Sequence, residues 1–221
     1  MPSRLRPTAS VAADAILVGD PGRALMLAQE LLEQPKMCNH ARGLWGYTGK
    51  TPAGDELTLQ STGMGGPSAA LILADLAELG VRRAIRIGTC TALAPELQPG
   101  ERLLVTEAHA WGGATGGGGS VVHPDPTLSA RLREALSEPV RPGIVASLDT
   151  LHSGGTEAPV EEGEATDMQT AALLDRGRLL GLALAAVLVV VESAAGDQLD
   201  DDGLERAAKS AGRAASAVLS A

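Results

Sequence analysis

The chain has 221 residues, of which 44% are apolar, enough for one α/β domain with a single core. Its 27 acidic residues outnumber the 18 basic ones, and the net charge of −9 argues against a nucleic-acid groove or an anionic membrane surface as partner. There is no Phe, one Tyr and two Trp, so a site that stacks on a base has few rings available.

The cysteines and the apolar runs exclude further classes of protein. Cys38 and Cys90 make no disulfide framework, and no Cys/His spacing resembles a zinc site. The longest apolar run, residues 182–191, is shorter than the roughly 20 residues of a membrane span. The N-terminus lacks the apolar segment of a secretory signal. We therefore expect a cytoplasmic protein without a metal, membrane or nucleic-acid partner.

Aliphatic runs alternate with helical patterns along the chain. The predicted strands are 15–18, 56–61, 84–88, 102–108, 143–148 and 185–191. The predicted helices are 24–33, 67–79, 126–136, 168–180 and 204–219, and the last has three Asp residues, 200–202, at its positive end. This alternation predicts an α/β sheet covered on both faces, in a single domain over residues 1–221.

Two segments are predicted to be loops. Residues 112–120 read GGATGGGGS, and they lack the Lys-Ser/Thr pair that makes a phosphate-binding P-loop specific. We interpret this segment as a surface or rim loop. Residues 153–166 are also loop-like, and their acidic side chains are expected to be solvated.

The stretch GDPGR, residues 19–23, follows the first strand and precedes a helix. It offers glycine backbone and the guanidinium of Arg23 to an anion. The stretch IRIGTCTAL, residues 85–93, does the same: Arg86 is expected to leave a strand end, where Gly88-Thr89 turns the chain. Guanidinium groups bind oxyanions such as phosphate bidentately.

Each arginine also has a simpler interpretation. Arg23 could be a charge on a helix surface, and Arg86 could pair with one of the many carboxylates. Because both lie beside a glycine that follows a strand, the pair favours an oxyanion site. A third glycine stretch, STGMGGPSAA at 61–70, allows close approach of a ligand or simply close helix–strand packing.

These stretches, together with two more, carry a family resemblance. In chain order they are GDPGRA, NHARGLWGYTG, STGMGGPSAA, RIGTCTAL and TDMQTAALL. The chain resembles the nucleoside phosphorylase family from about residue 4 to its final helix, above all the purine nucleoside phosphorylases that assemble as hexamers. The resemblance implies a phosphorylase/hydrolase-like three-layer α/β fold around a mixed, partly barrel-like sheet. It also implies reversible cleavage of a nucleoside N-glycosidic bond by inorganic phosphate, the co-substrate, giving a free base and a (deoxy)ribose 1-phosphate.

The resemblance assigns roles to individual positions. The phosphate site would contain Gly19, Arg23, Arg42, Arg86 and Thr89. Arg42 would reach the phosphate of a neighbouring subunit, so the protein would be a homo-oligomer, a dimer at least and a hexamer by family likeness. The ribose and base would meet Arg4, Met64, Thr91, Leu151, His152, Met168 and Gln169. Glu192 and Arg206 would be the catalytic pair, with Glu192 as the acid near N7 of the leaving base.

The chain departs from the family at several of these positions. Gln169 stands where the family has a glutamate that accepts hydrogen bonds from the ribose hydroxyls, and losing a charged acceptor costs roughly 1–3 kcal/mol. Glu192 stands at the position of an aspartate, and Arg206 lies one place beyond the family's arginine. Alternatively, Glu192 merely faces solvent. The family's N-terminal histidine, lent to the ribose of a neighbouring subunit, appears here as Arg4 or is absent, and Leu151-His152 stands where an aromatic flanks the base.

Three functions follow. The first is phosphorolysis of a purine nucleoside. The second is hydrolysis of a thio-adenosine nucleoside by water. Arg23 and Arg86 argue against it, because a water nucleophile does not need two arginines around an anion pocket. The third is a divergent pseudoenzyme that binds nucleoside or phosphate with little turnover, which the changes at Gln169 and Glu192 favour. If Gln169 is a damaged ribose acceptor, Gln169→Glu should raise kcat/KM about tenfold.

Overall fold

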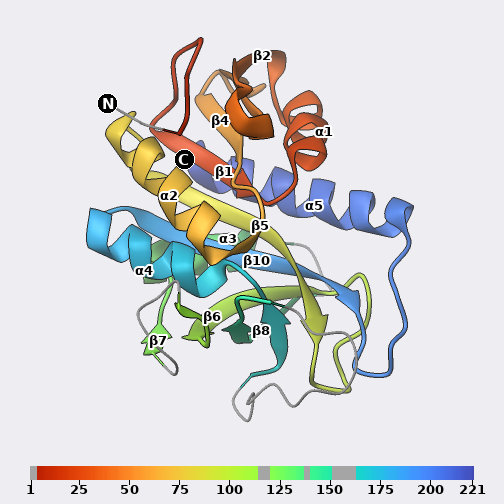
Figure 1. Cartoon of the computed structure of the whole chain (residues 1–221). Coiled ribbons are helices and arrows are strands. Elements are labelled where there is room, and N and C mark those ends of the chain that lie inside the picture. Colours follow the sequence, from red (N-terminus) through yellow and green to blue (C-terminus); the bar gives the residue numbers. More distant parts are fainter. Residues whose placement is uncertain (1–3, 114–119, 137–139, 151–162) are drawn as a thin grey trace.

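The structure, a computed structural model, describes residues 4–113, 120–136, 140–150 and 163–221 (Figure 1). The helices are α1 (Pro21–Leu31), α2 (Gly65–Glu78), α3 (Pro126–Ala135), α4 (Thr170–Leu180) and α5 (Asp201–Leu219), with a short 3-10 turn, η1 (Ala41–Gly43). The strands are β1 (Asp14–Val18), β2 (Glu33–Asn39), β3 (Gly46–Lys50), β4 (Glu56–Ser61), β5 (Arg83–Ala92), β6 (Arg102–Ala110), β7 (Ser120–Val122), β8 (Val140–Ser147), β9 (Ala165–Asp167) and β10 (Ala183–Glu192).

The described strands form one mixed sheet that is partly closed. Its order is β10-β6-β8-β9-β5-β1-β4-β3-β2, and β10 also pairs with β5. This extra pairing closes β5, β9, β8, β6 and β10 into a barrel, from which β1, β4, β3 and β2 extend as an open sheet. Strand β5 is parallel to β1 and β10 but antiparallel to β9. The mixed, partly barrel-like sheet expected from the sequence is confirmed.

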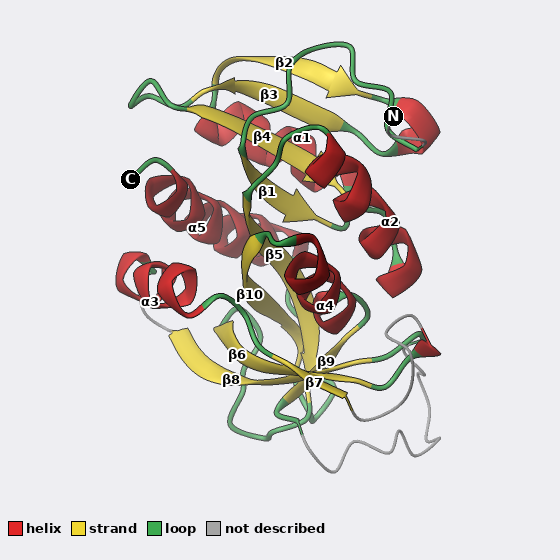
Figure 2. Ribbon diagram, turned by 90° about the vertical axis from the view of Figure 1, so that its left-hand side faces the viewer, coloured by secondary structure: helices red, strands yellow, loops and turns green. Residues whose placement is uncertain are grey.

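Helices cover both faces of the sheet, which makes three layers. In Figure 2, α3 and α5 lie on one side and α2 and α4 on the other. One buried cluster joins the inner faces of α2 and α4 to the sheet, and the second joins those of α1, α3 and α5. Successive residues of β1 alternate between the clusters: Leu17 packs in the first, Ile16 and Val18 in the second. A strand buried on both faces therefore reads as continuously apolar.

The helix starts follow from capping side chains. Asp20 caps α1 by accepting from the backbone N–H of Arg23 (2.7 Å), so this helix begins at Pro21 rather than at residue 24. Asp200 caps α5 in the same way, accepting from Gly203 N–H (2.7 Å), and Asp201 and Asp202 occupy the first turn. The predicted placement of these aspartates at the positive helix end is confirmed.

Four strands were not predicted from the sequence: β2, β3, β7 and β9. Strand β2 is an edge strand whose Gln34 has a positive φ of 49° and whose Pro35 cannot donate to a ladder, so it lacks a strand pattern. Strand β9 corrects the loop prediction for 153–166, because Ala165 and Thr166 belong to it. Most of that segment, like residues 114–119 of the predicted glycine loop, lies outside the described residues.

Candidate active site

A cavity of about 460 Å³ opens where three helices begin. Its lining residues come from four separate segments: Gly19, Asp20, Pro21 and Arg23; Gly63, Met64 and Gly65; Arg86, Gly88 and Thr89; Asp167, Met168 and Gln169. The structure thus brings together seven of the residues expected at the site: Gly19, Arg23, Met64, Arg86, Thr89, Met168 and Gln169.

The sheet topology explains why distant segments meet here. Strands β4, β1 and β5 are parallel neighbours, so β1 and β4 end on the same side and lead directly into α1 and α2. Strand β9 runs antiparallel to β5, with Thr166 beside Thr91, so the chain that leaves β9 turns back along β5 toward Arg86. Helices α1, α2 and α4 all present their N-termini to the cavity wall, and unpaired N–H groups at helix N-termini favour anions.

Arg23 lies in the first turn of α1 and is half-buried in the cavity wall. Within the described part of the chain, its guanidinium makes no ion pair or hydrogen bond. Burial lowers the pKa of Arg23, the Asp20 carboxylate opposes this shift, and the neighbouring Arg86 charge lowers the pKa further. Because arginine still remains protonated, the cavity holds a cation whose charge is poorly compensated.

Arg86, in contrast, is held on every side-chain nitrogen. It is 4% exposed. Its Nη2 donates to Asp167 Oδ2 (2.9 Å), its Nη1 to Gln169 Oε1 (2.8 Å) and its Nε to Thr170 Oγ1 (3.0 Å). The pairing of Arg86 with a carboxylate is therefore confirmed; Arg86 also lines the cavity, where its role toward an oxyanion stays a prediction. The guanidinium retains further N–H groups, so it can still donate to a ligand.

Asp167 is the buried carboxylate that balances Arg86. It accepts hydrogen bonds from Ser147 Oγ (2.5 Å) and from the hydroxyl (2.5 Å) and backbone N–H (3.0 Å) of Thr170. Ser147 Oγ in turn accepts from Ala171 N–H (2.9 Å). Asp167, Ser147 and Thr170 were not among the site residues predicted from the sequence. A signal was present for Asp167, because an aspartate three residues before a helical N–H is a typical capping pattern.

Gly88 makes room for the Arg86 guanidinium. A Cβ at Gly88 would lie 2.6 Å from Arg86 Nη2 and 2.6 Å from a Leu188 methyl group. The expectation that Gly88-Thr89 turns the chain is wrong, since β5 continues to Ala92. Residues 86 and 88 point to the same side of a strand, so the missing side chain at one creates the space for the long side chain at the other.

Gln169 is 4% exposed and has three protein partners. Its Oε1 accepts from Arg86 Nη1 (2.8 Å) and lies 3.1 Å from Thr62 Oγ1, whose single proton is shared with the Val18 carbonyl oxygen, also at 3.1 Å. Its Nε2 donates to the Gly63 carbonyl oxygen. The side chain thus connects the turn between β4 and α2 to the arginine of β5.

The expected catalytic pair is not assembled. Glu192, half-buried at the end of β10, pairs in register with Thr91 of β5, but neither residue lines the 460 Å³ cavity. Arg206 lies exposed on α5. Among the described residues, no hydrogen bond or ion pair joins Arg206 to Glu192.

The residues expected to serve a neighbouring subunit lie elsewhere. Arg42 is exposed in η1 with a left-handed φ of 61°. Arg4 is bound within its own chain, because its backbone N–H donates to Asp75 Oδ2 (2.6 Å) and its guanidinium lies 3.4 Å from Asp75 Oδ1. Leu151 and His152 lie outside the described residues.

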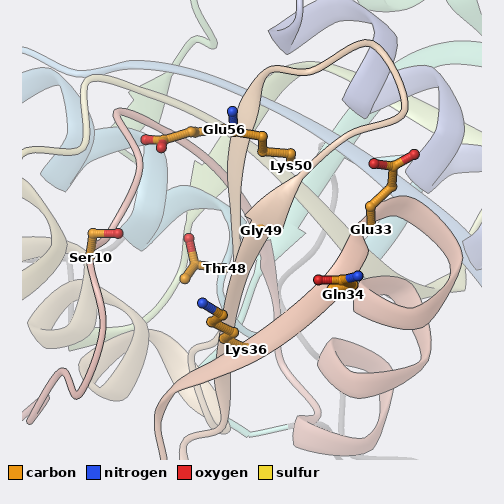
Figure 3. A pocket seen from close by; sticks show the side chains of 8 residues that line it. All are labelled: Ser10, Glu33, Gln34, Lys36, Thr48, Gly49, Lys50 and Glu56. Carbon is orange, nitrogen blue, oxygen red and sulfur yellow. The ribbon is translucent and has the colours of Figure 1, made fainter.

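A second cavity, of about 390 Å³, lies on the outer sheet and contains none of the expected site residues. Figure 3 shows its lining: Ser10, Glu33, Gln34, Lys36, Thr48, Gly49, Lys50 and Glu56. The charged side chains, Glu33, Lys36, Lys50 and Glu56, are all exposed. Within the described residues none of these four makes an ion pair.

Within the described ranges, no cluster of three or more His, Cys, Asp or Glu side chains could hold a metal ion. No helix in those ranges combines the length and the apolar character needed to cross a membrane.

Comparison with known proteins identifies the family. The sequence model of the Phosphorylase superfamily matches residues 14–221. A DeoD-type purine nucleoside phosphorylase of Alkaliphilus metalliredigens (strain QYMF) is 30% identical over 195 residues, which cover 83% of each chain. Another, of Oceanobacillus iheyensis, is 41% identical over 98 residues, 43% of this chain and 41% of that protein.

A solved structure supports the same assignment at the level of the fold. The purine nucleoside phosphorylase of Toxoplasma gondii, in complex with immucillin-H, superposes with a TM-score of 0.85 at 22% identity, over 95% of this chain and 91% of that one. The resemblance in the sequence motifs is thereby confirmed. With its three-layer architecture and a family match over most of its length, the chain belongs to the Phosphorylase superfamily.

Proposed function

We propose that the chain is a nucleoside phosphorylase that cleaves the N-glycosidic bond of a purine nucleoside with inorganic phosphate. The observation that carries this proposal is the excess of hydrogen-bond donors in the 460 Å³ cavity. Arg23 has no protein partner among the described residues, Arg86 has N–H groups to spare, and three helices present their N-termini. Such a surface suits an anion rich in acceptor oxygens, and the phosphate dianion, with three unprotonated oxygens, is such a ligand.

The chemistry follows from the position of that anion. A phosphate oxygen forms a bond to C1′ while the N-glycosidic bond breaks, and the bonding electron pair leaves with the base. The sugar becomes cationic in the transition state, so a phosphate fixed beside C1′ both attacks and stabilises the developing charge. The base then takes up a proton, a role for which we propose Glu192. The products are a free base and a sugar 1-phosphate.

We further propose that the working unit is a homo-oligomer to which Arg42 contributes across a subunit boundary. Its exposure on η1, outside the cavity of its own chain, supports this. A second cationic side chain from a neighbour would also help to balance a dianion, because Asp167 already compensates Arg86.

The test is nucleoside cleavage with and without phosphate, using inosine, adenosine, uridine and a thio-adenosine nucleoside. We expect base release only with phosphate, and a sugar 1-phosphate among the products. Equal release without phosphate would instead identify a nucleosidase. Ligand binding without any turnover would identify a binding protein.

A further inference from the structure

Gln169 lies where three turns of the chain approach each other in the cavity wall. A Cβ at Gly19 would lie 3.4 Å from the Gly63 carbonyl oxygen and 3.8 Å from Gln169 Nε2, which are ordinary van der Waals distances. The turn after β1, the turn after β4 and the start of α4 are therefore close neighbours around Gly19. A side chain here can influence all three turns.

The neighbours fix which way the Gln169 amide faces. Arg86 can only donate, so the amide atom that faces its Nη1 must be the oxygen. The Gly63 carbonyl can only accept, so the atom that faces it must be the nitrogen. The reversed amide would set N–H against N–H and oxygen against oxygen. This orientation is set by the partners and does not depend on distinguishing nitrogen from oxygen.

The contacts leave Gln169 with at most one acceptor position. Its oxygen receives a hydrogen bond from Arg86, and its second lone pair faces the Thr62 hydroxyl, whose one proton can go to Gln169 or to the Val18 carbonyl oxygen. Only one N–H remains after the bond to Gly63. A sugar hydroxyl that needs an acceptor would therefore compete with Thr62 at this residue, although Gln169 lines the cavity.

We propose that Gln169 is a positioning residue of the anion site: its acceptor side holds the Arg86 guanidinium in place, and its donor side fixes the Gly63 turn at the start of α2. This inference rests on the proposed function only in naming phosphate as the anion. It assigns Gln169 to phosphate capture rather than to the sugar. It also reverses the expectation for Gln169→Glu, which should now lower kcat/KM rather than raise it. A carboxylate offers Gly63 no donor and adds a negative charge beside the anion.

A neutral side chain suits this task because Arg86 already has a carboxylate partner. Asp167 compensates the guanidinium charge at 2.9 Å, and Gln169 adds a neutral acceptor at 2.8 Å. With Thr170, three side chains hold the arginine, but only the Asp167 carboxylate neutralises its charge. Its remaining N–H groups thus stay available to an incoming anion.

The decisive measurement is calorimetric titration of inorganic phosphate without nucleoside. Gln169→Met keeps a side chain of similar length and removes every hydrogen bond, and we expect it to weaken phosphate affinity about tenfold, which is about 1.4 kcal/mol. Gln29→Met, on the exposed surface of α1, is the matched control and should bind as the parent does. In turnover, KM for phosphate should rise more than KM for the nucleoside. A residue that only contacts the sugar would leave phosphate binding unchanged.

A second variant and a spectroscopic measurement test the same positioning role independently of Gln169→Met titration. Thr62→Val preserves volume and removes the hydroxyl that lies 3.1 Å from both Gln169 Oε1 and the Val18 carbonyl oxygen, so it tests the same network if Gln169→Met does not fold; it should weaken phosphate binding several-fold. In proton–nitrogen spectra, the Arg86 Nε–H signal, assigned by its loss in Arg86→Lys, should be sharp in the parent and broadened in Gln169→Met.

The outcomes separate this inference from the proposed function. If the parent binds phosphate and a folded Gln169→Met or Thr62→Val binds it equally well, the positioning role is overturned and the proposed function stands. If the parent binds no phosphate, the proposed function fails, and the Arg86 signal still decides the positioning role: an unchanged signal in the variants refutes it, and a broadened one supports it.

Discussion

The two cavities described above are similar in volume, about 460 and 390 Å³, but they are built in opposite ways. In the first, Arg86, Asp167 and Gln169 are each at most 4% exposed and hold one another through hydrogen bonds. In the second, exposed lysines and glutamates stand around the Gly49 backbone without ion pairs in the described residues (Figure 3). Buried polar groups are expensive unless they are satisfied, so a cavity that keeps them is organised for a ligand, whatever its size.

Arg86→Ala should cause the largest loss of both unfolding free energy and phosphate affinity. This change removes the guanidinium that compensates Asp167 and leaves a buried carboxylate without a counter-charge. Breaking a buried pair in this way costs about 3–5 kcal/mol of unfolding free energy, and phosphate binding should be lost with it. Chemical denaturation and calorimetric titration measure the two effects. A variant as stable as the parent would show that the buried pair is not what distinguishes the first cavity.

Arg23→Met should weaken phosphate binding without destabilising the fold. The guanidinium makes no hydrogen bond or ion pair within the described residues, so removing it breaks no such bond and takes away a half-buried charge that the Asp20 carboxylate compensates only in part. Losing a charge-assisted hydrogen bond to the ligand costs about 1.5–3 kcal/mol, roughly a ten- to hundredfold loss of affinity. Calorimetric titration gives the phosphate affinity, and a melting curve on the same sample gives the stability of the fold. Unchanged affinity would place the anion away from Arg23.

Gly88→Ala tests whether the space beside Arg86 matters. The new methyl group would approach Arg86 Nη2 and Leu188 to 2.6 Å, closer than side chains tolerate. Overpacking costs about 1–3 kcal/mol, and the displaced guanidinium should weaken phosphate binding several-fold. Gly54→Ala is unsuitable as a control because of its positive φ, whereas Ala53→Gly alters an exposed turn only. A stable Gly88→Ala protein with normal phosphate affinity would contradict the packing argument.

Substitutions in the second cavity should change phosphate affinity and unfolding free energy least. Replacing Lys36 and Lys50 together by Met should leave phosphate affinity within about twofold and the unfolding free energy within about 0.5 kcal/mol, as is usual for exposed positions without specific partners. If phosphate binding instead fell as far as in Arg23→Met, the second cavity would be the anion site and the contrast drawn above would be reversed.

Local chemistry in the sequence was enough to predict the framework of the cavity. The apolar run before Gly19 and the Asp-Pro pair that starts α1 both depend on neighbours in the chain, so the strand and the turn could be recognised directly. Arg23 and Arg86 could be assigned to an anion site for the same reason. The five sequence motifs were enough to indicate the family and its fold.

The partners of Arg86 could not be predicted in this way. Asp167 lies 81 residues further along the chain, and it reaches Arg86 only because the short strand β9 enters the sheet beside β5. Strand β9 has three residues and no alternating pattern, so neither the strand nor the contact it creates leaves a local signal. Gly88 was misjudged for a related reason, because its role depends on the side chain two residues before it rather than on a turn.

The four segments that line the cavity, residues 19–23, 63–65, 86–89 and 167–169, meet only when β1, β4, β5 and β9 all occupy their places in the sheet. A partly folded chain therefore has no such cavity, and a ligand that enters it binds the native state alone. Binding of this kind raises the free energy of unfolding by about 2.7 kcal/mol at a ligand concentration a hundredfold above Kd. Under the proposed function the ligand is phosphate, and the melting temperature of the protein should then follow the phosphate concentration, so that the supply of this proposed co-substrate also governs how long each molecule survives in the folded state.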